Sequence, residues 1–230
     1  MLFRSPTKLP FSLNAQPNTM TVTQIIRFHA HSASEADDQA NAAVKALKGA
    51  KAPENYVLGT QIQDKRNLQL SSEWHDPKAE SSKEAEAYRE TVIKSLGNPE
   101  KMFHVSFKDG QSAFDNGGPL SSPLVEFVQI YFPTDKVTKE FRDKIEKEFQ
   151  KFDDICTPAA KGNGAVTYGW VLEEQEHKDV KKSKCFFVAR GWEGMQYFED
   201  VIKTDEYKEA VKILMGWQAP WDMWHVKREF

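Results

Sequence analysis

Two histidines in similar surroundings are the first residues of this sequence that could do chemistry. His104 lies in the stretch Met-Phe-His-Val and His225 in the stretch Met-Trp-His-Val. Imidazole and phenol groups can serve as general bases or hydrogen-bond partners for a small molecule. We therefore predict His225, His104 and Tyr131 as catalytic candidates. The structural alternative for each is a side chain that pairs with a neighbour inside the core.

Alternation along the predicted strands supplies a second group of candidates. Arg27 and His29 share one face of the stretch VTQIIRFHA, and Gln129 shares a face with Tyr131 in LVEFVQIYF. These mixed faces suit a lined cavity, whereas the apolar faces suit packing against helices. By the same argument, His104 and His225 are expected on the cavity side. Arg27, His29, Gln129 and Trp192 are the predicted substrate-binding residues. Arg27 could equally join two sheets as a buried ion pair, and Trp192 could simply pack the barrel rim.

Composition and motifs exclude several other functions. The chain has 230 residues and a formal net charge of −3, which favours neither nucleic acid nor an anionic membrane as a partner. No apolar run approaches the roughly 20 residues of a membrane span. The sequence shows no glycine-rich phosphate loop, serine nucleophile elbow or metal-ligand spacing, so we expect no cofactor and no metal. Cys156 and Cys185 show no redox spacing and are predicted to be free thiols in the cytoplasm.

The candidates sit on elements whose order is β-α-β-β-α-β, and that order occurs twice. In the first half we predict strands at 22–30, 56–63, 68–75 and 102–108, with helices at 34–48 and 82–96. In the second half we predict strands at 124–132, 166–173, 185–192 and 223–228, with helices at 135–152 and 194–214. The longer final helix carries a break signal at Thr204-Asp205.

This order predicts an α+β fold made of two tandem ferredoxin-like repeats. We assign residues 1–20 to a disordered leader, 21–109 to the first repeat, 110–123 to a linker rich in Gly, Ser and Pro, and 124–230 to the second repeat. Each repeat has one sheet face that its helices leave open. We expect the two faces to pair sheet to sheet in one pseudo-dimeric barrel, with a ligand cavity between the repeats.

The repeated order, with the stretch ARGWEGMQYFEDVIKTDEYKEAVKILMGWQAPWDMWHVKREF, resembles fungal proteins with antibiotic-biosynthesis-monooxygenase domains of the dimeric α/β-barrel superfamily. A weaker version, SSEWHDPKAESSKEAEAYRETVIKSLGNPEKMFHVSF, lies in the first half. Members of this family include cofactor-free monooxygenases that oxidise phenolic polyketides. The resemblance transfers no catalytic motif residue by residue.

The resemblance implies a small-molecule enzyme of secondary metabolism, most readily a cofactor-independent monooxygenase with an aromatic or polyketide-like substrate. Such an enzyme needs a substrate that reduces oxygen after deprotonation, within a dry aromatic pocket. Two alternatives stay open. One is an enzyme with the same scaffold that catalyses cyclisation, decarboxylation or dehydration. The other is a non-catalytic barrel protein that binds a ligand or has a stress-related role. Because one chain would complete the barrel, a homo-oligomer is not required.

Overall fold

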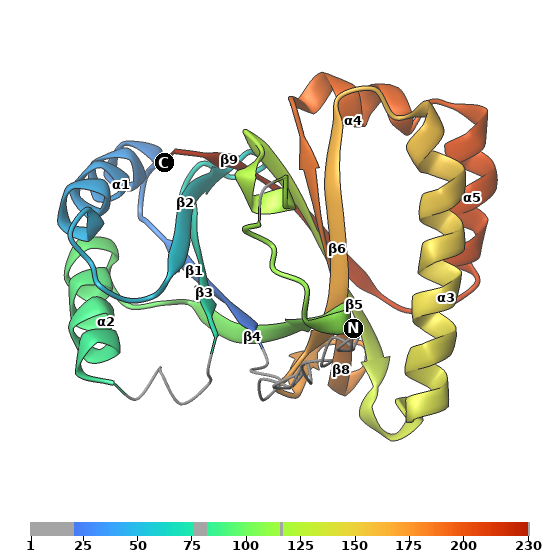
Figure 1. Cartoon of the computed structure of the whole chain (residues 1–230), viewed down its shortest axis with the longest axis horizontal. Helices are drawn as coiled ribbons and strands as arrows, with labels where there is room; N and C mark the ends of the chain where they lie inside the picture. Colours follow the sequence, from blue (N-terminus) through green and yellow to red (C-terminus); the bar gives the residue numbers. More distant parts are fainter. Residues whose placement is uncertain (1–20, 76–81, 116, 230) are drawn as a thin grey trace, which may run out of the picture.

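The protein is an α+β barrel with helices packed on two sides (Figure 1). The structure is a computed structural model that describes residues 21–75, 82–115 and 117–229. The predicted leader, residues 1–20, lies outside the described residues. In the described part of the chain, no helix is both long and apolar enough to cross a membrane.

The two halves of the chain contain the predicted elements with small shifts of their ends. The first half contains β1 (Val22–His29), α1 (Ala33–Leu47), β2 (Asn55–Gln61), β3 (Asn67–Trp74), α2 (Lys83–Leu96) and β4 (Lys101–Phe107). The second contains β5 (Leu124–Pro133), α3 (Lys139–Cys156), β6 (Asn163–Val171), β7 (Gln175–His177), β8 (Lys181–Trp192), α4 (Met195–Val201), α5 (Asp205–Met215) and β9 (Trp221–Arg228). The one strand that we did not predict among the described residues is β7, which pairs with the start of β8. Strand β8 begins earlier than predicted, at Lys181.

Hydroxyl side chains set the start of four of the helices. Ser32, Ser82, Thr138 and Thr204 each accept a hydrogen bond from the backbone N–H three residues later. Such caps satisfy backbone donors that a helix leaves unpaired at its start. The cap at Thr204 confirms the predicted break, because it separates α4 from α5.

Antiparallel pairing closes eight strands into a ring, in the order β5-β9-β2-β3-β1-β4-β6-β8 and back to β5, while β7 extends the β8 edge. The two halves meet edge to edge at two short seams. In one seam β2 pairs with β9, and in the other β4 pairs with β6. Each seam joins the last strand of one half to the second strand of the other.

A glycine lies in each seam, where the neighbouring strand approaches closely. A Cβ atom on Gly59 would lie 2.5 Å from the backbone oxygen of Lys227, and one on Gly169 would lie 2.1 Å from that of Ser106. Carbon atoms do not approach oxygen this closely, so only glycine fits at either place. The two glycines thus allow the ring to close.

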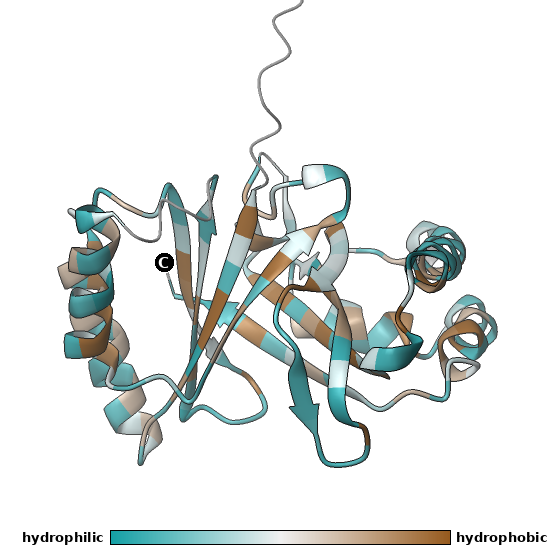
Figure 2. Ribbon diagram, turned by 90° about the horizontal axis from the view of Figure 1, so that it is seen from below, coloured by the Kyte–Doolittle hydropathy of each residue, from teal (hydrophilic) through white to brown (hydrophobic). Residues whose placement is uncertain are grey.

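The barrel interior is a packed core. Its buried side chains come from both halves: Ile25, Phe103, Val105, Phe107, Ala113, Leu120, Val125, Phe127, Tyr131, Val171, Cys185, Phe187, Ala189, Trp224 and Val226. Figure 2 shows hydrophobic residues along the strands of the barrel and hydrophilic residues on the outward faces of the helices. A small barrel of this kind is filled by its own side chains. We predicted a ligand cavity between the two halves, and the packed side chains show that this predicted position was wrong.

The same core corrects the predicted orientation of two strands. On β1 and β5 the mixed faces do point inward, as predicted. On β4 and β9 the apolar residues Phe103 and Trp224 point inward, so that His104 and His225 face the helices instead. The alternation of apolar and polar residues along β4 and β9 is as predicted. We expected the polar face to point inward because polar groups suit a ligand cavity. An interior filled by aromatic rings selects the apolar face instead.

The segment predicted as a linker also contributes to this core. Residues 110–123 include Ala113 and Leu120, which are buried at 0% and 2% exposure against the barrel interior. A short 3-10 turn, Pro119–Ser121, carries Leu120 into place. The connection between the halves therefore covers one end of the barrel.

Candidate functional site

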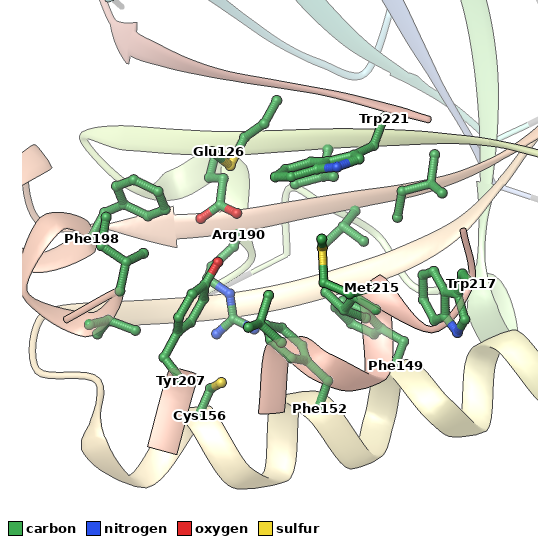
Figure 3. Close-up of a pocket in the computed structure, with 18 of the residues that line it drawn as sticks. Glu126, Phe149, Phe152, Cys156, Arg190, Phe198, Tyr207, Met215, Trp217 and Trp221 are labelled. Atoms are coloured by element: carbon green, nitrogen blue, oxygen red, sulfur yellow. The ribbon is translucent and has the colours of Figure 1, made fainter. Parts of the chain in front are cut away.

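A pocket of about 180 Å³ lies outside the barrel, between the sheet of the second half and helices α3, α4 and α5 (Figure 3). Its wall is mostly aromatic and aliphatic. The lining residues are Glu126, Val128, Ile130, Phe149, Phe152, Cys156, Ala160, Val188, Arg190, Trp192, Phe198, Val201, Ile202, Tyr207, Val211, Leu214, Met215, Trp217, Gln218, Ala219, Trp221 and Met223. An apolar pocket with a few polar groups is the usual form of a small-molecule site.

The charged groups of the pocket come from one row across the sheet. Arg190 on β8 lies opposite Glu126 on β5, and Glu126 lies opposite His225 on β9. Directly paired residues point to the same face of a sheet. The next row toward the other end is apolar, with Val188, Val128 and Met223. The charged groups are therefore confined to one end of an apolar floor.

Glu126 is the carboxylate that faces the cavity (Figure 3). Its Oε2 accepts a hydrogen bond of 2.9 Å from the indole N–H of Trp192. The side chain is partly buried, and this burial raises the pKa of Glu126. The charge of Arg190 and the Trp192 hydrogen bond counteract part of that increase. A carboxyl group with a raised pKa in an apolar site is suited to proton transfer.

Arg190 is held in place by partners on the helix side of the site. Its guanidinium forms an ion pair with Asp153 of α3, and its Nη1 donates to Asn163 Oδ1 at 2.8 Å. It also lies over the Trp192 ring, 5.9 Å from the ring centroid. Arg190 and Asp153 are both buried. With Arg190 paired in this way, its remaining influence on the cavity is to favour negative charge near Glu126.

Two further polar groups reach the cavity from the helices. Tyr207 of α5 points its hydroxyl toward Arg190 and Glu126 (Figure 3). Burial and the nearby carboxyl of Glu126 raise the pKa of Tyr207. Burial also raises the pKa of the Cys156 thiol to about 11, so that this thiol is not activated as a nucleophile. The raised pKa of Tyr207 keeps its hydroxyl protonated near neutral pH, so that Tyr207 is a neutral hydrogen-bond donor.

The pocket offers little to a metal ion. Within residues 21–75, 82–115 and 117–229, no group of three or more His, Cys, Asp or Glu side chains could hold a metal. Glu126 and Cys156 are the carboxylate and thiol of the pocket wall, and no histidine lines it among the described residues. The wall suits an organic molecule that is mainly apolar and has one polar edge.

Of the seven residues predicted from the sequence, Trp192 lines this pocket. His225 lies beside it, where its ring meets Phe198 of α4 edge to face at 4.4 Å between centroids. His104 occupies the corresponding place in the first half, where its ring contacts Glu173 and lies 3.0 Å from Gln24 Nε2. The described residues of that half contribute nothing to the pocket lining.

The remaining predicted residues lie at or near one end of the barrel. The Tyr131 hydroxyl donates to Asp222 at 2.8 Å, and Lys101 Nζ donates to Gln129 Oε1 at 3.4 Å. Arg27 lies over the Trp224 ring inside the barrel, 5.1 Å from its centroid. His29 is exposed and contacts Asn67. The structure therefore separates these residues from the pocket.

Sequence reasoning missed Glu126, Arg190 and Tyr207. The signal for Glu126 was present, because it is the one acidic residue in the strand LVEFVQIYF. A charge on the apolar face of a predicted strand needs a partner or a function. Arg190 carried the same signal in CFFVARGW. Tyr207 carried no such signal, because it lies on an ordinary amphipathic helix.

Comparisons with known proteins show likeness at the level of the fold. No family model matches this chain, and no curated protein matches it. An anthrone oxidase-like protein of known structure is 11% identical over 92% of each chain, with a TM-score of 0.61. A protein from Lactobacillus acidophilus NCFM that carries a provisional monooxygenase name is 14% identical, with 92% of this chain and 95% of that chain covered and a TM-score of 0.56.

A mutant chlorite dismutase from Candidatus Nitrospira defluvii is also similar. It is 10% identical, with 92% of this chain and 93% of that chain covered and a TM-score of 0.52. Identities this low show a shared fold alone. The same fold carries different reactions, so the function must be argued from the site.

Proposed function

We propose that this protein is a small-molecule enzyme, and specifically a cofactor-independent monooxygenase that acts on an aromatic or polyketide-like substrate. The observation that carries the proposal is a carboxyl group in an aromatic pocket, with its pKa raised by burial. The names of two proteins with this fold, an anthrone oxidase-like protein and a provisional monooxygenase, agree with it. The site proposed here replaces the expected cavity between the two halves.

In the proposed reaction, Glu126 removes a proton from an activated methylene group of the substrate. The resulting carbanion passes one electron to oxygen, and the two radicals combine to a peroxide. Loss of water then gives a carbonyl group, so that a methylene group and one molecule of oxygen become a carbonyl group and one molecule of water. The substrate supplies all the electrons, and the balance needs no further reductant. An anthrone, whose carbanion is stabilised by two flanking rings, is a substrate of this kind.

The residues around Glu126 are placed to exclude water, to donate a hydrogen bond and to supply positive potential. The apolar floor and the rings of Phe149, Phe152 and Trp217 surround a planar substrate and keep water away from the carbanion. The Tyr207 hydroxyl can donate to an oxygen on which negative charge is delocalised. Arg190, fixed by Asp153, supplies positive potential at the same end of the pocket without entering the reaction.

We further propose that the two halves, 21–109 and 124–230, are tandem ferredoxin-like repeats that form a pseudo-dimer. The support is a shared strand order, β4-β1-β3-β2 in the first half and β9-β5-β8-β6 in the second. We also propose a cytoplasmic role in fungal secondary metabolism, which rests on the sequence resemblance. Residues of a single chain line the proposed site, which is consistent with activity as a monomer, so assembly into a homo-oligomer is not required.

Oxygen consumption with anthrone tests the proposal. We expect the purified protein to consume one molecule of oxygen for each anthrone oxidised, well above the rate of the uncatalysed reaction. The variant Glu126→Gln should lose roughly 100-fold or more in kcat, as expected for removal of a general base. Glu146→Gln is a matched control, because Glu146 also accepts an indole hydrogen bond (from Trp170) but lies outside the pocket.

Three outcomes would separate the alternatives. Equal oxygen consumption by the wild-type protein and Glu126→Gln would refute the proposed role of the carboxyl group. Turnover that persists without oxygen would favour cyclisation, decarboxylation or dehydration. Binding of anthrone without turnover of any kind would favour a ligand-binding protein.

A further inference from the structure

His225 carries a buried polar group that the proposed reaction does not use. The residue is 1% exposed, and its Nε2 has no hydrogen-bond partner among the described residues. A buried polar atom without a partner destabilises the folded state, because it gives up its hydrogen bond to water. Native structures contain few such atoms, and each one needs a physical explanation.

Gln63 determines which nitrogen of His225 carries the proton. The backbone N–H of His225 donates to Gln63 Oε1 at 3.0 Å, and Gln63 Nε2 lies 2.8 Å from His225 Nδ1. Because a backbone N–H can only donate, the oxygen of the Gln63 amide must face it, and the amide NH2 must face Nδ1. Nδ1 therefore accepts, and the neutral ring carries its proton on Nε2. Burial lowers the pKa of His225 to about 4, which keeps the ring neutral at ordinary pH.

His104 in the first half is held in the opposite form. Glu173 accepts a hydrogen bond of 2.9 Å from the backbone N–H of His104 and also contacts its Nδ1. A carboxylate can only accept, so Nδ1 of His104 carries a proton. Gln24 Oε1 accepts from Ser72 at 3.3 Å, which turns its Nε2 toward His104 Nε2 at 3.0 Å. Nε2 of His104 is therefore an acceptor, whereas Nε2 of His225 is a donor.

The pair in the first half shows that two side chains so placed can meet. Gln24 lies opposite His104 in the pairing of β1 with β4, just as Glu126 lies opposite His225 in the pairing of β5 with β9. In the first half the pair is in hydrogen-bond contact. In the second half Glu126 contacts Trp192, and among the described residues the N–H of its histidine neighbour stays unpaired. A change in the side-chain torsions of Glu126 would bring the two groups together.

We propose that His225 is a positioning residue, held by Gln63 as an Nε2–H donor, which binds the carboxylate of Glu126 when that group is ionised. The Trp192 indole and the His225 imidazole would then hold the carboxylate from two sides. The consequence for catalysis rests on the proposed function, because it assigns His225 the task of keeping the base ionised and oriented. The proposed hydrogen bond between His225 and Glu126 does not itself depend on the proposed function.

The charges around Glu126 make a neutral donor useful here. Arg190 faces it from β8, Tyr207 from α5 and Cys156 from α3, while Asp153 of α3 neutralises Arg190. A second cation would be costly to bury in this apolar wall. A neutral imidazole N–H adds a hydrogen bond without adding a charge. Such a bond to a carboxylate should lower its pKa by about one to two pH units.

Carbon-13 NMR titration of the Glu126 carboxyl group, with nitrogen-15 shifts of the His225 ring, tests the inference without any need for turnover. In the wild-type protein we expect nitrogen shifts of an Nε2–H tautomer above about pH 6, where the ring is neutral. His225→Leu should raise the pKa of Glu126 by about one to two pH units, whereas His225→Gln, which keeps an N–H donor, should restore most of the shift.

Gln63→Glu leaves His225 itself unchanged. It gives His225 the acceptor that His104 has, so at about pH 8 the proton should move to Nδ1 and the pKa of Glu126 should rise as in His225→Leu. Glu173→Gln is the mirror control, which should change His104 and leave Glu126 as it was.

Two results would overturn the inference. One is an Nδ1–H tautomer for His225 in the wild-type protein, and the other is a Glu126 pKa that is the same in the wild-type protein and His225→Leu. If anthrone is not oxidised but the NMR shifts appear, the proposed function fails and this inference stands. If anthrone is oxidised, the acidic limb of the kcat/KM profile should move upward in His225→Leu by the same shift as the Glu126 pKa.

Discussion

Replacing Phe187 with alanine should separate the core of the barrel from its ligand site. Phe187 is fully buried inside the barrel, and its ring lies 5.5 Å from Phe103, 5.9 Å from Phe127 and 6.2 Å from Trp224, centroid to centroid. These neighbours belong to three different strands that enclose the ring, so the space left by truncation has no simple way to collapse. We expect a loss of about 4 kcal/mol in the free energy of unfolding, as for other buried Phe to Ala changes.

The magnitude gives a clear thermal signal. For a chain of this size, about 4 kcal/mol corresponds to a decrease in Tm of roughly 8–16 °C. Urea denaturation and differential scanning calorimetry would measure both quantities. Anthrone affinity, followed by quenching of tryptophan fluorescence below the transition, should stay within about twofold of the wild-type value, because the pocket lies on the other face of the sheet.

Phe198→Ala is the companion variant. Phe198 borders the pocket, so part of its ring already faces a cavity and its loss should cost less, about 2 kcal/mol. Its effect on anthrone affinity should exceed that of Phe187→Ala. The reasoning fails if Phe187→Ala costs less than about 1.5 kcal/mol, or if it abolishes anthrone binding while the protein is still folded. Either result would mean that the barrel interior is an open ligand site.

Three further predictions concern the seam, the buried ion pair and the carboxyl group. Gly169→Ala should cost about 2–3 kcal/mol in urea denaturation, because its Cβ would lie 2.1 Å from a backbone oxygen, whereas Gly49→Ala, with nothing within 4 Å, should stay within about 0.5 kcal/mol. Arg190→Met should cost about 3–5 kcal/mol, because it leaves Asp153 buried without its cation, and equal stability of this variant and wild type would contradict that. The raised pKa of Glu126 means that its ionisation is harder in the folded state, so wild-type stability should fall relative to Glu126→Gln as pH rises above about 4.3. A difference that is constant from about pH 4 to about pH 8 would count against the raised pKa.

The order and type of the main elements could be predicted because their signals are local. Alternating apolar residues mark β1 and β5, and a hydroxyl cap at Thr204 marks the start of α5. The inward face of a strand is not a local property. It depends on which surface the partner strands bring to the centre, and in β9 the choice between Trp224 and His225 was settled by rings from the other strands.

The position of the pocket could not be predicted from sequence patterns either, because it too depends on packing between distant residues. A helix that packs tightly and one that leaves a cavity have the same apolar periodicity. In the first half, small residues such as Ala36, Ala40 and Ala43 let α1 lie close to the sheet. In the second half, α3 and α5 instead turn the larger side chains Phe149 and Tyr207 toward the sheet, and a pocket lies among them. The space between the layers follows from how these side chains fit together, which the sequence does not state.

The two short seams have a consequence for how molecules of this protein interact when warmed. The seams pair Gly59–Gln61 with Val226–Arg228 and Val105–Phe107 with Gly169–Val171, and both are much shorter than the pairing of β5 with β8. If the halves part there, β2, β9, β4 and β6 each present an unpaired edge, which is a template for another strand. A half from a second molecule offers the same edges as the native partner. At high concentration, warming should therefore produce dimers in which two chains have exchanged halves, each of the two barrels being built from both chains.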